Sequence, residues 1–181
     1  MRYFIGFAIQ EEAGKWHTAL AKDISEKFDT WKIHEYIPSH ITLYRPFNMD
    51  DVSPIKDLLR AWIQKYSVSG TLTLSGFDRF ADRVVFAAVD MEKSTEDAIA
   101  DIRQKIMAVL PKEDFPNFVP HATLADNDVS PEKIEKIWKY VNTLPKPYFV
   151  VPFDNITLFR KEGEKKWVVD EMFPITRVDN M

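Results

Sequence analysis

The feature that most constrains the fold of this chain is an internal repeat of about 80 residues. Tyr3 lies 37 positions before His40, and Val84 lies 37 positions before His121. Both copies follow the order strand, helix, strand, helix, strand. A unit that occurs twice indicates a duplicated lobe, because a solenoid needs about three or more stacked repeats. Two equivalent lobes packed about a pseudo-twofold axis would bring His40 and His121 to opposite sides of one cleft.

The spacing of apolar residues predicts the elements of each copy. Nearly continuous apolar runs are typical of buried strands, and apolar residues three and four positions apart are typical of amphipathic helices. Ser-Pro pairs suit helix starts, because serine caps the first turn and proline fits its dihedral angles. The predicted strands are 3–9, 39–45, 69–80, 84–89, 118–125 and 148–159, with a final hairpin strand at 167–169, and the predicted helices are 11–28, 53–63, 94–110 and 130–141. The tail at 176–181 is expected to be loose.

In each copy, a predicted strand carries a histidine followed two positions later by a threonine. The two stretches are Pro38-Ser39-His40-Ile41-Thr42-Leu43 and Val119-Pro120-His121-Ala122-Thr123-Leu124. Since strand side chains alternate between two faces, the histidine and the threonine share a face, and their apolar neighbours point into a core. Two such strands facing each other would surround a small anion with two proton-transfer groups and two hydroxyl donors. The competing interpretation is a pair of histidines on solvated strand faces, with threonine present because it favours strands.

Composition limits the class of protein. With 181 residues, of which 45% are hydrophobic, the chain suits one domain or two closely packed small lobes. It has no cysteine, which excludes disulfides, thiolate metal sites and a cysteine nucleophile and fits a cytoplasmic location. No signal peptide and no apolar run of about 20 residues is present, so no membrane association is expected. The formal net charge of −4 argues against an extended grip on nucleic acid, although one phosphate needs only a local positive site.

The paired motifs resemble the signature of the two-histidine (2H) phosphoesterase superfamily, which includes the 2′-5′ RNA ligase-like (LigT-like) and cyclic phosphodiesterase proteins. Pro38, the pair Pro46-Phe47 and the opening residues 2–5 also look like this family. The resemblance implies one bilobal α+β domain over residues 1–175, in which two antiparallel sheets line a central water-filled groove and the helices lie outside. The residues that match the family's catalytic motif are His40, Thr42, His121 and Thr123.

The expected chemistry is metal-independent acid/base catalysis at phosphorus. When water opens a cyclic phosphodiester or cleaves a 2′-5′ bond, a base must take its proton and an acid must protonate the leaving sugar oxygen. Imidazole suits both transfers because its usual pKa of about 6.5 lies near the working pH, and threonine hydroxyls can donate to the phosphoryl oxygens. By analogy with the family, His121 is the base and His40 the acid, which predicts a bell-shaped dependence of rate on pH. No metal or other cofactor is expected, because two histidines without a carboxylate or thiolate at ligand spacing are a poor cation site.

Other residues near the motifs have two interpretations each. Tyr44 lies two positions after Thr42, so it should face the groove, where its phenol could stack on a base; alternatively, it is a packed strand aromatic. Arg45 could hold phosphate if the strand bends at the next residue, and is otherwise a solvated arginine. His17, in a predicted helix, and His34, in a connector, have no threonine two positions on and are expected to be structural or exposed.

The leading functional hypothesis is a monomeric phosphoesterase that acts on 2′,3′-cyclic phosphates of RNA or nucleotides or on 2′-5′ phosphodiester bonds, or a reversible 2′-5′ ligase. Its substrate would be a nucleotide or an RNA end. Within the enzymes, the alternative is hydrolysis of another small cyclic nucleotide or of 2′-5′ oligoadenylate. Outside the enzymes, the alternatives are a non-catalytic module that binds a nucleotide or phosphate and a scaffold without a phosphate site. Intact histidine and threonine in both motifs favour an enzyme, because binding alone does not need two titrating groups.

Overall fold

The computed structural model describes residues 1–66, 70–110, 118–126 and 129–176, which form two four-stranded antiparallel sheets and five helices. The strands are β1 (Arg2–Ala8), β2 (His40–Asn48), β3 (Thr71–Phe80), β4 (Val84–Met91), β5 (His121–Ala125), β6 (Phe149–Pro152), β7 (Asn155–Glu162) and β8 (Lys166–Pro174). The helices are α1 (Glu11–Phe28), α2 (Ile33–Tyr36), α3 (Ser53–Lys65), α4 (Lys93–Val109) and α5 (Pro131–Val141). The α+β architecture expected from the resemblance is confirmed.

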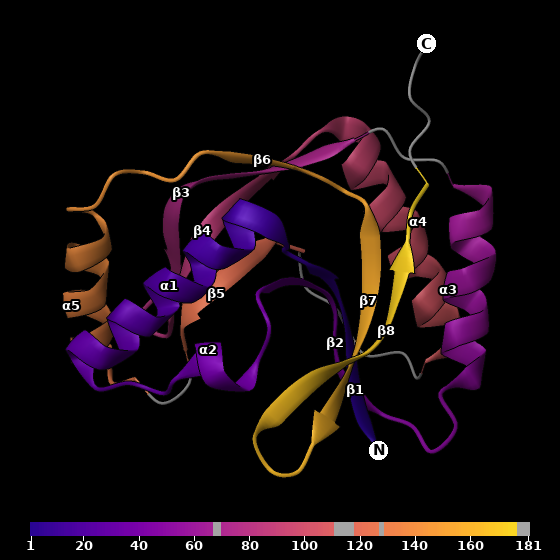
Figure 1. Ribbon diagram of the computed structural model, residues 1–181, viewed down its shortest axis with the longest axis horizontal. Helices are drawn as coiled ribbons and strands as arrows, with labels where there is room; N and C mark the ends of the chain where they lie inside the picture. Colours follow the sequence, from indigo (N-terminus) through magenta and orange to yellow (C-terminus); the bar gives the residue numbers. More distant parts are fainter. Residues whose placement is uncertain (67–69, 111–117, 127–128, 177–181) are drawn as a thin grey trace.

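Four of the five helices lie in two pairs at opposite ends of the molecule (Figure 1). Helices α3 and α4 pack side by side next to the sheet that contains β2 and β8, and α1 packs with α5 next to the sheet that contains β4 and β5. The larger group of buried apolar side chains spans both sheets and reaches Ala13 of α1, and a second group includes residues of α1, α5, β4 and β5. Ile55, Leu59 and Ile102 belong to the first group, whereas Ile24 and Ile137 belong to the second.

The Ser-Pro pairs act differently at the two helices that they precede. At α5, Ser130 is the N-cap, and its hydroxyl oxygen accepts a hydrogen bond from the backbone N–H of Lys133 at 3.3 Å. At α3, Ser53 is already the first helical residue and Val52 occupies the cap position. Here the backbone N–H of Ser53 donates to a carboxylate oxygen of Asp51 at 3.0 Å, so the acidic side chain satisfies the free donor instead.

The repeat seen in the sequence does not coincide with the two lobes. The first sheet has the strand order β2-β1-β7-β8, and the second has the order β5-β4-β3-β6. Strand β3, from the first copy, pairs with β4 of the second copy, and β7, from the second copy, pairs with β1 of the first. The first helix of each copy crosses over as well, since α1 contacts β5 and α4 contacts β2. Each lobe is therefore built from both copies.

One predicted strand is wrong: the stretch 148–159 is two strands in different sheets. Strand β6 pairs with β3, whereas β7 pairs with β1 and β8. The chain crosses between the sheets at Phe153 and Asp154, where the N–H of Phe153 donates to the carbonyl of Gly70 at 3.0 Å and the N–H of Ile175 donates to the carbonyl of Asp154 at 2.8 Å. Both halves are apolar, so hydrophobic spacing alone could not indicate the crossing.

The connector before β2 also differs from expectation, because residues Ile33–Tyr36 form the short helix α2. Of the tail that was expected to be loose, residues 177–181 lie outside the described residues.

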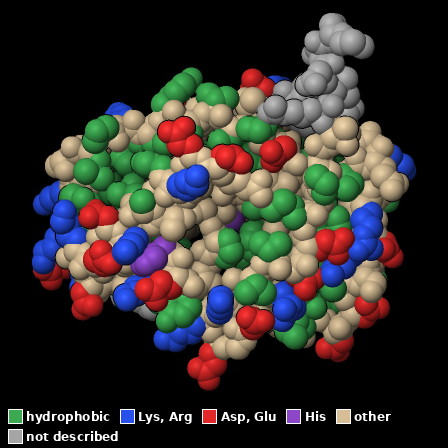
Figure 2. Space-filling view, viewed as in Figure 1, with side chains coloured by type: hydrophobic (Ala, Val, Ile, Leu, Met, Phe, Trp, Pro, Cys, Tyr) green, Lys and Arg blue, Asp and Glu red, His purple; other side chains and the backbone are tan. Residues whose placement is uncertain are grey.

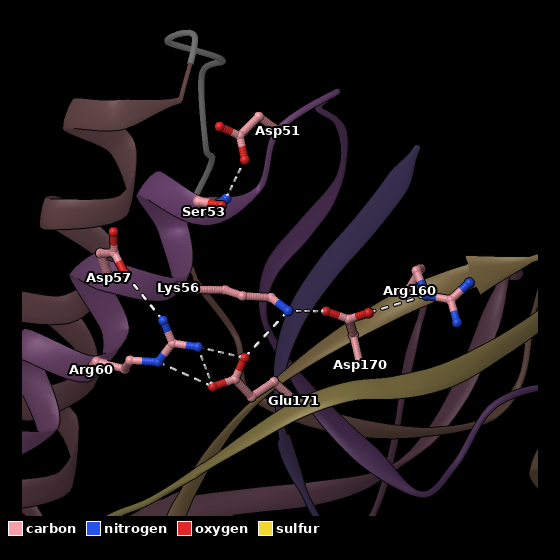
Figure 3. Close-up of polar contacts among 8 residues, drawn as sticks. All are labelled: Asp51, Ser53, Lys56, Asp57, Arg60, Arg160, Asp170 and Glu171. Atoms are coloured by element: carbon pink, nitrogen blue, oxygen red, sulfur yellow. Dashed lines mark hydrogen bonds and ion pairs between the residues drawn. The ribbon is translucent and has the colours of Figure 1, made fainter.

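A network of charged side chains joins α3 to the C-terminal hairpin (Figure 3). The ammonium of Lys56 lies 2.7 Å from a carboxylate oxygen of Asp170 and 3.3 Å from one of Glu171. Arg60 donates to both carboxylate oxygens of Glu171 at 2.8 and 3.0 Å, and Arg160 donates to Asp170 at 3.1 Å. The two carboxylates are each shared between two cations, which fixes α3 over strand β8 on the outer side of the first sheet.

Candidate active site

The two histidine motifs begin the edge strands of the two sheets, and these strands meet. Strands β2 and β5 occupy equivalent positions at one end of each strand order, and they contact each other where the sheets approach. His40 pairs with Ala8 on β1, and His121 pairs with Ala88 on β4, so the two copies place their histidines in the same register. The imidazoles are close enough for the charge of His121 to lower the pKa of His40. Strands β2 and β5 therefore bring the two motifs close to each other, and the cleft between them stays a prediction.

Each histidine is oriented by the same backbone hydrogen bond. Nδ1 of His40 lies 2.8 Å from the carbonyl oxygen of Pro38, and Nδ1 of His121 lies 2.8 Å from the carbonyl oxygen of Val119. A carbonyl oxygen can only accept, so Nδ1 carries the proton in both rings. In the neutral imidazole, the lone pair then resides on Nε2. Both rings thus have the tautomer that a base acting through Nε2 requires.

Phenylalanine rings support each imidazole from within its own sheet. The ring of His40 lies 4.8 Å from the ring of Phe4 and 5.5 Å from that of Phe159, measured between centroids. The ring of His121 lies 4.9 Å from that of Phe80 and 5.1 Å from that of Phe86. In each sheet, one phenylalanine comes from the neighbouring strand and the other from the strand beyond it. The site therefore has two equivalent halves, in each of which an imidazole packs against two phenylalanine rings.

These apolar surroundings change the acidity of both imidazoles. Burial lowers the pKa of His40 to about 4, opposed by the hydrogen bond to Pro38 and assisted by the charges of His17 and His121. Burial also lowers the pKa of His121, opposed by the hydrogen bond to Val119. In the free protein at neutral pH, both rings are consequently uncharged.

The threonines lie beside the histidines as the alternation of strand side chains predicts. Thr42 and Thr123 are half-buried, like the two histidines, while Ile41 and Ala122 between them are fully buried in the core. Each half of the site consequently has an imidazole and a hydroxyl on one face of an edge strand.

The expected placement of Tyr44 on that same face is wrong, because the strand is irregular. Residue pairing steps from Gly6 with Thr42 to Ile5 with Tyr44, so β2 has one extra residue there. Such a bulge reverses the alternation after it. Tyr44 is 3% exposed and packs edge-on against Phe47, with 5.9 Å between ring centroids, and burial raises the pKa of its phenol. The packed interpretation of Tyr44 therefore agrees with the structure.

Arg45, the other residue proposed near the motif, is half-buried. Its positive charge lies close enough to Tyr44 to oppose the upward shift of the phenol pKa.

A residue that the sequence did not associate with the site, His17, lies between the two motifs. Its ring is 5% exposed, with Nε2 2.9 Å from the carbonyl oxygen of Thr123 and Nδ1 3.0 Å from the hydroxyl of Ser39. The expectation that His17 is structural or exposed included burial but gave no indication of these partners. The signal was present in α1, because His17 lies four positions from Ala13 and from Ala21, both on the buried face of the helix.

One face of the molecule has a hollow with side chains of both charges around it (Figure 2). Figure 2 shows histidine atoms at the bottom of a hollow near the middle of one face, with positive and negative side chains interspersed around it. Within the described residues, no group of three or more His, Asp, Glu or Cys side chains is arranged to hold a metal ion. None of the helices in that part of the chain is long and apolar enough to cross a membrane.

Comparison with known proteins identifies the family. Residues 9–165 match the family model of the 2′-5′ RNA ligase superfamily, and the chain belongs to that superfamily. The recognition of a LigT-like two-histidine phosphoesterase from its motifs is thereby confirmed. A search of curated proteins found no match.

Solved structures show the same fold. The protein TT0787 of Thermus thermophilus superposes with a TM-score of 0.63 at 20% identity, covering 98% of this chain and 99% of that one. E. coli LigT in its apo form superposes with a TM-score of 0.58 at 16% identity, covering 97% and 98%. LigT complexed with 3′-AMP gives a TM-score of 0.55 at 16% identity over the same shares.

Proposed function

We propose that the protein is a metal-independent phosphoesterase that cleaves 2′,3′-cyclic phosphates or 2′-5′ phosphodiester bonds in RNA ends or nucleotides. The observation that carries the proposal is the matched pair of half-sites, in which His40 and His121 each donate Nδ1–H to a backbone carbonyl and keep Nε2 for proton transfer. Membership of the 2′-5′ RNA ligase superfamily supports this class of chemistry. The complex of the structurally similar LigT with 3′-AMP supports a nucleotide ligand.

In the proposed reaction, water attacks phosphorus as the bond to a ribose oxygen breaks. Nε2 of His121 accepts the proton of the attacking water, and Nε2–H of protonated His40 donates a proton to the departing ribose oxygen. The hydroxyls of Thr42 and Thr123 donate to the two non-bridging oxygens, on which negative charge is distributed. The site returns to its starting state when the proton moves back from His121 to His40 through solvent, and in the reverse, ligating direction the two histidines exchange roles.

The lowered pKa values fit this mechanism if the negative charge of the bound substrate raises the pKa of the histidine that acts as the acid. A phosphodiester carries one negative charge, and an anion between the imidazoles favours the protonated form of either ring. Binding would thereby recruit the proton that His40 needs as the acid. Arg45 is a further proposed contact to phosphate, whereas the buried Tyr44 is left out of the proposed site. We also propose that the protein is cytoplasmic, because its sequence has no cysteine. We propose further that it is a monomer.

One observation favours a second candidate function, a non-catalytic module that binds a nucleotide or phosphate. Burial keeps both histidines neutral in the free protein, and a neutral pair lacks the acid that the reaction needs. Such a module would still bind a phosphate through the threonine hydroxyls and would gain histidine protons on binding. Turnover separates the two functions.

The deciding experiment is turnover in the presence of EDTA with a panel of substrates. The panel contains 2′,3′-cyclic nucleotides, 2′-5′ dinucleotides, 2′-5′ oligoadenylate and RNA ending in a cyclic phosphate. We expect the wild type to cleave at least one class, and His40→Ala and His121→Ala each to lower kcat by about 10²–10⁴-fold, because each removes one proton transfer. His34→Ala is the matched control, since this histidine hydrogen-bonds weakly to Ser25 within the helical layer and is expected to leave kcat unchanged.

Two results would contradict the proposal. Equal turnover by the wild type and the His40→Ala/His121→Ala double variant would show that the histidines are not the catalysts. Binding of a nucleoside 2′-phosphate without turnover of any substrate class would favour the binding module instead.

A further inference from the structure

His17 connects the two halves of the site. Its Nε2 lies 2.9 Å from the carbonyl oxygen of Thr123 on β5, and its Nδ1 lies 3.0 Å from the hydroxyl of Ser39, the residue before His40. The ring is 5% exposed and comes from α1, which belongs to the first copy of the repeat but packs against β5 of the second. One buried side chain therefore holds the start of one motif and the middle of the other.

The directions of these hydrogen bonds follow from the chemistry of the partners. The carbonyl of Thr123 can only accept, so Nε2 of His17 carries the proton, and Nδ1 of the neutral ring is an acceptor that faces the hydroxyl of Ser39. The hydroxyl of Ser39 also lies 2.9 Å from that of Thr18 and 3.2 Å from the carbonyl oxygen of Gly14, to which it can donate. The result is a hydrogen-bonded cluster that joins Gly14, Thr18 and Ser39 to His17 and, through its Nε2–H, to Thr123. Burial keeps the ring in this neutral form by lowering the pKa of His17 to about 4.

The anchored atoms lie next to the groups that the proposed chemistry uses. Ser39 is also held by its backbone, because its carbonyl accepts the N–H of Ile9 at 2.9 Å, so its side chain and main chain are both fixed where His40 begins. On the other strand, the carbonyl that His17 holds belongs to Thr123, two residues after His121. A change at His17 would consequently move one motif strand relative to the other, rather than either strand alone.

His17 itself has no nitrogen available for substrate. Both ring nitrogens have partners, and the ring is almost completely buried. It differs in this respect from His40 and His121, for which the bond to a backbone carbonyl occupies Nδ1 alone.

We infer that His17 is a positioning residue, which sets the distance between His40 and His121 by hydrogen-bonding to both motif strands. The inference rests on the proposed function for its effect on rate, but the placement of the two imidazoles can be measured without turnover. Plain core packing predicts something different: any apolar ring or chain of similar volume at residue 17 would then preserve the site.

The test compares two substitutions of similar size. His17→Gln keeps one amide donor for the carbonyl of Thr123 and one acceptor for Ser39, whereas His17→Leu keeps the volume and removes both. The matched control is Tyr140→Phe, which removes the 2.5 Å hydrogen bond from Tyr140 to Asp23 and so weakens the docking of α1 on α5 without touching a motif strand. For each protein, kcat and KM are measured with 2′,3′-cyclic AMP, the pKa values of the His40 and His121 rings are measured by NMR, and the melting temperature is recorded.

We expect His17→Leu to lower kcat by about 10- to 100-fold with KM changed by less than about threefold, since displaced reacting groups lose rate more than affinity. We also expect the ring pKa values of both His40 and His121 to move. His17→Gln should restore kcat to within about threefold of the wild type, and Tyr140→Phe should lower the melting temperature without changing kcat or either pKa. If His17→Leu does not fold, Ser39→Ala, which removes the hydroxyl partner of His17 together with its contacts to Thr18 and Gly14, should show the same changes in smaller size.

The inference is overturned if His17→Leu keeps the kcat and both imidazole pKa values of the wild type, or if His17→Gln is impaired as severely as His17→Leu. Failure of the proposed function has a different signature. In that case the wild type does not turn over any substrate, while the NMR comparison of the variants still decides whether His17 positions the two rings.

Discussion

At the scale of single residues, the site is defined by two histidines whose surroundings are nearly identical. His40 and His121 have the same carbonyl partner two residues earlier and the same arrangement of two phenylalanines. The shared hydrogen-bond and ring contacts do not mark either histidine as the base or the acid, although the charges of His17 and His121 lower the pKa of His40 further. The direction of proton transfer then depends on the substrate, and the pair should titrate as a unit with apparent pKa values that belong to both rings.

The first prediction at this scale concerns pH. The value of kcat/KM reports on the free protein, where the acid must be protonated although burial lowers the pKa of His40 to about 4 and also lowers that of His121. Above these lowered values, the protonated fraction decreases as pH rises, so kcat/KM should reach its maximum below about pH 6.5 and then decline. The profile of kcat should lie at higher pH, because a bound phosphodiester anion raises the imidazole pKa values.

The measurement is steady-state kinetics with a 2′,3′-cyclic nucleotide from about pH 4 to about pH 9. Two profiles with the same maximum, or a kcat/KM that keeps rising above neutral pH, would contradict the assignment of a buried, neutral pair.

The sequence indicates His40, Thr42, His121 and Thr123 as candidates because their signal is local and repeated. His40, Thr42, His121 and Thr123 each follow from the period of a strand, which holds wherever the pairing is regular. Tyr44 is only two residues beyond Thr42, but the intervening bulge depends on pairing with β1 and leaves no mark in the spacing of β2 itself.

At the scale of elements, the position of each edge strand depends on how closely the neighbouring strand packs against it. Gly6 on β1 pairs with Thr42, and a Cβ at this position would lie 2.9 Å from the carbonyl oxygen of Ile41 and 3.2 Å from a ring carbon of Phe159. Because Gly6 has no side chain, β1 can lie close both to β2 and to the ring of Phe159, which packs against His40.

The second prediction, at the scale of elements, is therefore that Gly6→Ala disturbs the first half-site. The nearest atom is backbone and cannot rotate away, so β2 must shift, and we expect a loss of about 1–3 kcal/mol in the free energy of unfolding. Because the shifted segment adjoins His40, kcat should fall as well. Gly163→Ala is the control: Gly163 has a φ of 64° and no atom within 4 Å of a built Cβ, so its cost is about 1 kcal/mol of backbone strain without an effect on kcat. Urea unfolding and steady-state kinetics of both variants measure the difference, and an unchanged kcat in Gly6→Ala would contradict the coupling.

At the scale of the whole molecule, the duplicated pattern and the two lobes are not the same division of the chain. The sequence predicted two equivalent antiparallel lobes, and these are present, but it gave no indication that the copies exchange elements. Strands β3 and β7 and helices α1 and α4 each lie in the lobe whose motif strand comes from the other copy. Hydrophobic spacing reports which face of an element is buried, not which neighbour buries it, so this exchange could not be read from the pattern.

The exchange predicts that neither copy folds alone. A first fragment, residues 1–82, would contain β1 and β2 but not β7 and β8, which complete their sheet. Its β3 would have no partner strand. The second, residues 83–176, would contain β4 and β5 without β3, and an α4 without α3 and without β1 and β2 of the first sheet. Each fragment leaves a sheet with an open edge and an uncovered apolar face, which is unstable in water. When the two fragments are mixed, every strand pairing can form again, and only the covalent turn between β3 and β4 is missing.

We expect each fragment alone to show no cooperative thermal transition by circular dichroism, and an equimolar mixture to show one, together with the catalytic activity of the intact chain. Because His40 and His121 lie on different fragments, a His40→Ala first fragment mixed with a wild-type second fragment gives a folded but inactive control. A cooperative transition in either isolated fragment would mean that one copy forms a stable lobe by itself, and the exchange would then be an addition to the fold rather than a condition for it. In that outcome, the stable lobe would form without its link to the other half-site. The hydrogen bonds of His17 join a helix from one fragment to a strand from the other, so an isolated fragment cannot make them all.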